Sequence, residues 1–317
     1  MRPVRPGTPV DTRLGAALPK AVRRHLATRK PQGELHPAER RAGGSSTVGG
    51  TTGIGGCNLG MAFGVPVQVV PSTATSNENG ITVLPNGSKA YVGVRASSTG
   101  NFDLKSVTRT AIDLAFGSPM DDTDVSALNT ADSETDPQSS EDGVTRLLAR
   151  STSITTQIYM SNRANTTVSF STATVLGNNV NSAQGTFAPR LNSLKTQLYW
   201  TANWTINQGD ISGINVTNVT TPAIFNLSAA KQRRFVLTDD QKTAYFGSDA
   251  TVSSASYFRV YVSTRATTTA AWSTPTIVAE VDDNSKAYAL ADISGDGCII
   301  YLQSNSNSHL YQARKPN

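Results

Sequence analysis

The stretch DISGDGCIIYLQSNSNSHLYQARKPN (292–317) contains a polar turn, a strand centred on a tyrosine and a second strand that ends in arginine. The same order of features occurs at four earlier places in the chain, each begun by a polar turn whose last residue we use as an anchor. Repeats of 46 to 56 residues predict a propeller or a solenoid. Because every copy consists of strands and turns, we predict an all-β repeat protein. The five anchors are Gly87, Gly143, Lys195, Gln241 and Gly297.

Arginine ends the second strand of four copies, and an aromatic residue follows this position by seven residues in the first four copies. A residue that recurs once per repeat at a fixed offset favours an architectural role over a basic ring for an anionic ligand. We therefore interpret the arginines as caps of their own repeats and the aromatics as packing between repeats. The arginines are Arg109, Arg163, Arg265 and Arg314, and the aromatics are Phe116, Phe170, Phe225 and Trp272.

The fifth copy is incomplete, because the chain ends before its aromatic strand. Residues 63–70, FGVPVQVV, match the strands that follow the arginine in the first and fourth copies, FGSPMDDTDV (116–125) and WSTPTIVAEV (272–281). Closing a ring of sheets removes exposed strand edges. We therefore predict a five-bladed β-propeller over 61–317, with the Phe63 strand completing the last blade. If this strand is not the closure, the alternative is six blades.

Residues 1–60 differ from the rest of the chain in composition. Residues 1–42 hold ten Lys or Arg against three acidic residues, whereas the whole chain has a net charge of +5. The predicted propeller is therefore near neutral, and no nucleic-acid surface is expected on it. The basic segment and the Gly/Ser/Thr-rich linker of 43–60 favour disorder. The alternative is a short amphipathic helix built on Leu14, Leu18, Val22 and Leu26, acting as a membrane or nucleic-acid tether.

Charged residues make up only 16% of the chain, and Ser, Thr and Asn are abundant. A surface hydrated by hydroxyls and amides favours a periplasmic, cell-surface or secreted protein, which we expect to be a monomer. No apolar run reaches the length of a transmembrane helix, and no signal peptide is visible. Export would then require a segment outside this sequence.

The two cysteines, Cys57 and Cys298, fall on either side of the predicted ring closure. A disulfide between them would close a very long loop and stabilise the fold by about 4 to 5 kcal/mol in the chain-entropy model. The alternative is a buried Cys298 and a linker thiol at Cys57.

Nine residues before each anchor is a position just ahead of the predicted inner strand of each blade. The five residues differ in type while the scaffold repeats, as in a binding site added to a symmetric frame. We predict a ligand or partner surface here, at one mouth of the ring; the alternative is a set of ordinary solvated loop residues. The positions are Glu78, Glu134, Thr186, Gln232 and Tyr288.

Catalytic and metal motifs are weak in this chain. A glycoside hydrolase would need paired carboxylates, and Glu78 and Glu134, with Asp136 and Asp292 nearby, are the candidates. The histidines do not support a Ser-His-Asp triad or a zinc site. DISGDG resembles the start of a calcium loop, but the twelfth position is Gln303, which favours a tight hairpin turn. We expect no cofactor and no metal.

The repeat segments DISGDGCIIYLQS with LYQARKP, and LTDDQKTAYFGSD with VYVSTR and WSTP, resemble the TolB-type, WD-like β-propeller repeats of bacterial cell-envelope proteins over about 62–317. The resemblance implies a non-enzymatic binding or scaffolding propeller that engages a protein or glycan partner. The α/β domain that accompanies the TolB propeller is not found here, which argues against a Tol-Pal role. The alternative is a carbohydrate-active enzyme that uses carboxylates at the channel mouth.

The third repeat departs from the pattern and is the place where we expect a specialised surface. It has lost both the Asp-Gly turn and the terminal arginine, which is replaced by Asn218. It also carries Trp200 and Trp204 in LYWTANW. We expect one of these tryptophans in the core and the other as a surface stacking platform.

Overall fold

The computed structural model describes residues 56–71, 77–97, 99–181, 185–228, 230–250, 257–282 and 288–317. The chain divides into two compact units, Met1–Val48 and Gly49–Asn317, and only the second contains described residues. The predicted disorder or amphipathic helix of the basic segment therefore lies outside the described residues. No helix in the described part has the length and hydropathy needed to span a bilayer.

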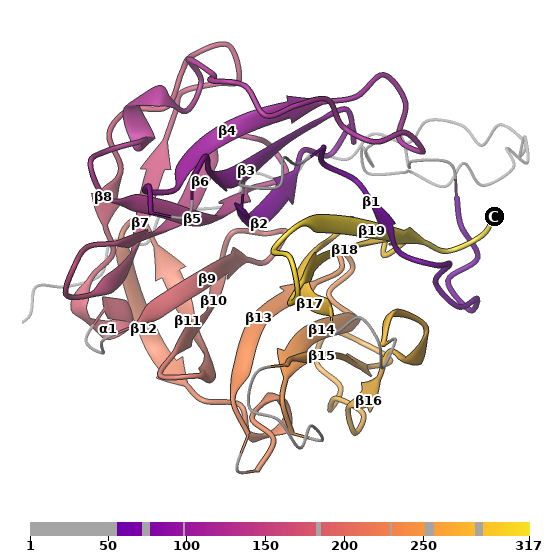
Figure 1. The fold of residues 1–317 in the computed structure, drawn as a ribbon. Helices are drawn as coiled ribbons and strands as arrows, with labels where there is room; N and C mark the ends of the chain where they lie inside the picture. Colours follow the sequence, from indigo (N-terminus) through magenta and orange to yellow (C-terminus); the bar gives the residue numbers. More distant parts are fainter. Residues whose placement is uncertain are drawn as a thin grey trace, which may run out of the picture. The chain divides into compact units, whose positions relative to one another are not determined.

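The described chain forms five antiparallel sheets, shown in Figure 1. Blade 1 contains β2 (Asn77–Val83), β3 (Lys89–Arg95) and β4 (Asp103–Thr108); blade 2 contains β5 (Ser133–Ser139), β6 (Thr145–Ser151), β7 (Thr156–Asn162) and β8 (Thr174–Val175). Blade 3 contains β9 (Thr186–Leu191), β10 (Gln197–Ala202), β11 (Thr205–Ser212) and β12 (Asn215–Thr220); blade 4 contains β13 (Gln232–Leu237), β14 (Thr243–Ser248), β15 (Arg259–Thr264) and β16 (Thr276–Ile277). Blade 5 contains β17 (Tyr288–Ile293), β18 (Ile299–Ser304), β19 (Leu310–Arg314) and β1 (Val67–Gln68).

Short helical segments connect some of these strands. They are α1 (Asn178–Asn181) and the 3₁₀ turns η1 (Ser126–Leu128), η2 (Ala223–Phe225) and η3 (Ala279–Val281). A bridge between Ser106 and Met120 stands where blade 1 would have its fourth strand.

The two ends of the described chain close the ring. The inner strands β2, β5, β9, β13 and β17 contact one another in this order, and β17 contacts β2. β1 pairs with β19, with Val67 opposite Gln312 and Gln68 opposite Tyr311, as Figure 1 shows for the indigo and yellow strands. The predicted five-bladed propeller and its closure by the Phe63 segment are thus confirmed.

The core consists of five apolar clusters, one between each pair of neighbouring blades in the described chain. The repeated phenylalanines Phe116, Phe170 and Phe225 are each no more than 2% exposed and belong to three of these clusters. The prediction that they pack between blades is confirmed. Trp272 is partly buried and packs edge-on against Phe225.

Three of the four repeated arginines close their own blades. Nε of Arg109, Arg163 and Arg265 donates to the anchor carbonyl of the same blade, at 2.7, 2.8 and 2.8 Å. Each guanidinium also lies over the aromatic ring seven residues later, at 4.2, 4.3 and 4.3 Å from its centroid. In blade 5, Lys315 takes the cationic position over Phe63 at 4.9 Å. The recurrence of Arg and an aromatic seven residues apart is therefore one structural unit.

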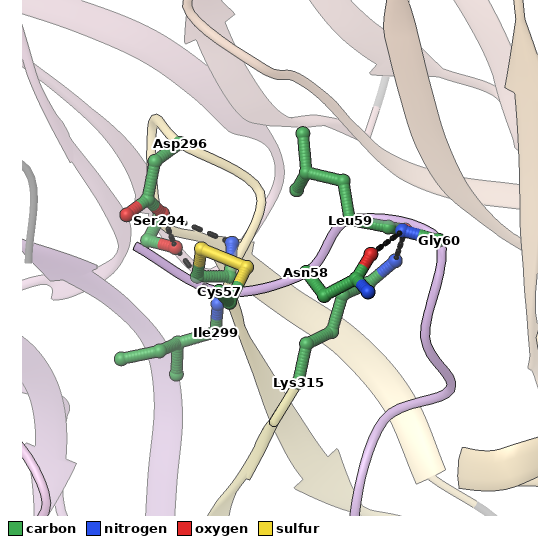
Figure 2. Close-up of a disulfide and its surroundings, with 9 residues drawn as sticks. Cys57, Asn58, Leu59, Gly60, Ser294, Asp296, Ile299 and Lys315 are labelled. Carbon is green, nitrogen blue, oxygen red and sulfur yellow. Dashed lines mark hydrogen bonds between the residues drawn. A yellow bond between two sulfur atoms is a disulfide. The ribbon is translucent and has the colours of Figure 1, made fainter. Parts of the chain in front are cut away.

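A disulfide joins Cys57 to Cys298 beside this closure, across a sequence separation of 241 residues. Figure 2 shows the segment after Cys57 lying along the turn of blade 5, where Lys315 Nζ donates to the Leu59 carbonyl at 2.7 Å. Asp296 Oδ1 accepts from the Cys298 amide at 2.9 Å and holds the turn that precedes the cysteine. The start of the described chain is therefore fastened to the last blade by both a strand and a covalent bond.

Candidate functional site

The propeller has two mouths, which we name from its inner strands. Each inner strand begins at the strand-start mouth and ends at the turn mouth, where the anchor turn leads into the second strand. The first residues of inner strands contact the loops between the second and third strands of the preceding blade: Glu78 N donates to Ser308 O at 3.1 Å and Gln232 N to Trp204 O at 2.8 Å. The predicted site residues belong to the strand-start mouth.

All five predicted site residues occupy the first or second position of an inner strand, and each is at most 3% exposed. They are not solvated loop residues, because the strands begin earlier than the sequence indicated. Their side chains are packed inside the ring. The set is Glu78, Glu134, Thr186, Gln232 and Tyr288.

The two glutamates of this set are held by neighbouring polar side chains. Glu78 Oε2 lies 3.0 Å from His309 Nδ1. Glu134 Oε1 accepts from Arg150 Nε at 2.8 Å and from the Thr130 hydroxyl at 2.7 Å. Burial raises the pKa of Glu134 above its ordinary value despite these donors. Both carboxyl groups are fully buried.

Arg234 and Asp136 form a buried ion pair between inner strands, which was not predicted from the sequence. Arg234, on β13, donates from Nε and Nη2 to Asp136 Oδ1 on β5 at 2.9 and 2.6 Å. It also reaches Asn79 Oδ1 at 2.7 Å and Gln303 Oε1 at 2.9 Å. Although burial opposes ionisation, Arg234 and Arg233 hold the pKa of Asp136 below its ordinary value. The sequence feature that could have predicted this ion pair is the Arg-Arg pair in the inner strand QRRFVL, whose last three residues are apolar.

An aromatic platform lies at the strand-start mouth beside blade 3. We define it as Phe187, Trp204 and Phe258. Trp204 packs edge-on against Phe187 at 5.4 Å and stacks with Phe258 at 5.9 Å, and Lys231 Nζ lies 5.4 Å from the indole centre. Trp204 is 41% exposed, whereas Trp200 is 2% exposed. Trp200 is therefore in the core and Trp204 on the surface, as the sequence predicted for this pair.

Trp204 also has an unusual backbone conformation. Ala202 pairs with Thr205, so Asn203 and Trp204 form a two-residue hairpin turn, with φ of 49° and 62°. Such turns favour glycine at the second position, and a left-handed conformation costs a non-glycine residue about 1 to 2 kcal/mol. Strain of this kind in an exposed aromatic residue points to a role other than stability.

The turn mouth opens into a cavity of about 720 Å³ lined by residues of all five blades. Its rim is built from anchor turns that contact one another: Ser193 Oγ donates to Asp239 O at 2.9 Å, and the Asp239 amide donates to Gly295 O at 2.8 Å. The inner strands contribute one equivalent residue each to its lining: Thr82, Gln138, Arg190, Val236 and Asp292. Among the described residues, no group of three or more His, Cys, Asp or Glu side chains is arranged to hold a metal ion.

Known proteins resemble this chain in fold only. No family model matches the chain, and no curated protein matches its sequence. Among solved structures it is similar to TolB from Acinetobacter baumannii, with 13% identity, a TM-score of 0.44, and coverage of 75% of this chain and 54% of that one. A putative glycoside hydrolase from Parabacteroides distasonis is 11% identical, with a TM-score of 0.50, and the match covers 84% of this chain and 95% of that one.

The five sheets of the described chain form a β-propeller, and the match spans about half the length of the Acinetobacter TolB chain. At such identities the likeness concerns the fold alone, because propellers serve many unrelated functions.

Proposed function

We propose that this protein is a non-enzymatic binding propeller of the bacterial cell envelope or exterior, which engages a glycan at the strand-start mouth. The observation that carries the proposal is the exposed, strained Trp204 of the aromatic platform. An indole face is electron-rich, so it packs well against the C–H groups on one face of a pyranose ring. Lys231 adds a positive charge beside it, which favours a glycan that contains acidic sugars.

Two further observations support the location and the absence of catalysis. The Cys57–Cys298 disulfide is typical of proteins that fold outside the cytoplasm. The carboxyl groups required by the glycoside hydrolase alternative, Glu78 and Glu134, are buried, Glu78 beside His309 and Glu134 in an ion pair with Arg150. A protein partner could use the same platform, because exposed tryptophan is common among residues that dominate binding energy at interfaces.

The test is the variant Trp204→Gly, which removes the indole and places the preferred residue in a left-handed turn. We expect at least about a tenfold loss of affinity for acidic envelope polysaccharides, equivalent to about 1.4 kcal/mol, measured by affinity electrophoresis and by calorimetry. Thermal unfolding should show that the fold is retained.

The matched control is Ile154→Ala, which shortens an exposed residue in the equivalent turn of blade 2. Its affinity should equal that of the wild type. Equal affinity in the Trp204→Gly variant would contradict the proposal, and loss of a protein partner without any glycan binding would favour the protein alternative.

A further inference from the structure

The cavity at the turn mouth has a strongly negative lining. Two cationic side chains, Arg190 and Lys315, also line it, and Arg190 Nε is already 3.8 Å from one of the carboxylates. The lining is therefore complementary to a cation. Its six carboxylates come from blades 2, 4 and 5: Glu141, Asp239, Asp240, Glu280, Asp292 and Asp296.

The carboxylates at the rim repel one another. The carboxyl groups of Asp239 and Glu141, from the turns of blades 4 and 2, interact across the cavity. Desolvation, this interaction with Glu141 and the charges of Asp296 and Asp240 raise the pKa of Asp239 to about 8. The Asp239 carboxylate is also in close contact with Gly295, where a Cβ atom would lie 1.9 Å from Oδ2. A positive group at this rim would relieve the repulsion.

Unused hydrogen-bond acceptors line the same cavity. Gln138 is 8% exposed, and its Oε1 has no hydrogen-bond partner; neither has the neighbouring Ser139 Oγ. Both residues line the cavity. Buried polar atoms normally have partners, so these two oxygen atoms could each accept a hydrogen bond from a ligand that brings N–H donors.

We propose that the turn-mouth cavity binds a small organic polyamine. Its ammonium groups pair with the rim carboxylates, and one terminal amine donates to Gln138 and Ser139. A volume of about 720 Å³ falls within the range of roughly 300 to 1,000 Å³ typical of small-molecule sites. This site is at the opposite mouth from the aromatic platform, so the inference does not depend on the glycan proposal.

Calorimetry of the full-length, oxidised protein with spermidine tests the site. We expect binding that weakens as salt is added, and a loss of at least about tenfold in the double variant Asp239→Asn/Asp240→Asn. Asparagine at 240 retains the Oδ1 acceptor used by Thr238 Oγ1 and the Lys242 amide, so that turn keeps its bonds. The matched control, Asp113→Asn/Asp121→Asn, replaces the same number of carboxyl groups at exposed positions of blade 1 outside the cavity and should bind as the wild type does.

Two further measurements keep the test decisive if the double variant folds poorly. Gln138→Met should weaken spermidine binding several-fold while leaving the rim charges unchanged. At pH 7, binding should release protons, because an ammonium group near Asp239, which faces the carboxylates of Glu141, Asp240 and Asp296, favours the ionised form of Asp239. The apparent enthalpy would then depend on the buffer.

The absence of spermidine binding in the wild type would overturn the inference, as would equal losses in the rim and control double variants. Trp204→Gly should bind spermidine normally, so failure here and failure of the glycan proposal are separate results.

Discussion

At the scale of single residues, the anchor of every repeat has the same left-handed backbone conformation. Gly87, Gly143 and Gly297 have φ of 71°, 68° and 75°, and Lys195 and Gln241 reach 56° despite their side chains. The hairpin that the Asp-Gly turns predicted is therefore preserved where the glycine is absent. In blades 3 and 4 the surrounding strands impose a conformation that the local sequence disfavours.

Replacing Gln241 by glycine should therefore stabilise the protein. Relief of the left-handed strain is expected to raise the free energy of unfolding by about 1 kcal/mol, because the side chain contributes only a 3.4 Å contact to Asn192. Urea denaturation measures the change. The reverse exchange, Gly87→Gln, should lower stability by a similar amount, and no difference between the two variants would show that the strain is not released.

The Asp136–Arg234 pair in the channel acts at the same scale. Arg234 joins blade 4 to blades 1, 2 and 5 through one guanidinium group. Replacing Asp136 by asparagine keeps the shape and tolerates φ of 48°, but leaves a buried cation without its counter-charge. We expect a loss of about 3 to 5 kcal/mol in unfolding free energy, measured by denaturant titration at pH 7.

The stability difference between the wild type and Asp136→Asn should depend on pH. Because the pKa of Asp136 is lowered in the folded state, its contribution is complete above the unfolded pKa of about 3.9 and is lost as pH falls through the lower folded value. The stability difference between wild type and Asp136→Asn should therefore shrink in that acid range. A constant difference down to strongly acidic pH would contradict the assignment.

At the scale of elements, the Arg-aromatic unit ties the third strand of a blade to its anchor turn and to the next segment. Arg163 donates to Gly143 O, lies over Phe170 and forms an ion pair with Asp124. Tyr91 also donates to Asp124, so blade 1 is joined to blade 2 through this carboxylate. Lysine cannot reproduce the planar guanidinium contacts.

Arg163→Lys should therefore cost about 2 kcal/mol, which combines a charged hydrogen bond and a stacking contact. The control is Arg259→Lys: its ion pair with Asp282 is partly exposed, and the exchange should cost less than about 1 kcal/mol. Thermal unfolding of both variants checks the order, and a smaller loss for Arg163→Lys would argue against the capping role.

At the scale of the whole molecule, closure depends on a short strand. β1 contributes only two ladder residues, Val67 and Gln68, and the disulfide fixes the segment that precedes it. Cys57→Ser/Cys298→Ser is expected to lower the unfolding free energy by about 5 kcal/mol in the chain-entropy model, measured under non-reducing conditions. Leu59 lines the turn-mouth cavity, so the variant should also weaken spermidine binding.

Much of this architecture was predictable because it depends on repetition. The spacing of the anchors, the Arg-aromatic pairs and the unfinished fifth copy determine strand content, blade number and closure without knowledge of any contact. The match between residues 63–70 and the strands of other copies was sufficient to place the closing strand.

The candidate sites were less predictable, because they depend on which side chains meet across the ring. Glu78 and Glu134 were predicted to belong to a ligand or partner surface just ahead of the inner strands, whereas both lie within those strands and are buried beside His309 and Arg150. The sequence offered no reason to select Glu141 and Asp239 as site residues, because residues from blades 2 and 4 become neighbours only when the ring is closed. The sequence by itself thus determined a closed, five-fold repeat with a variant third blade. Tertiary structure alone decided which polar groups are paired and buried and which line a cavity, because that outcome depends on distances across the channel that no local pattern encodes.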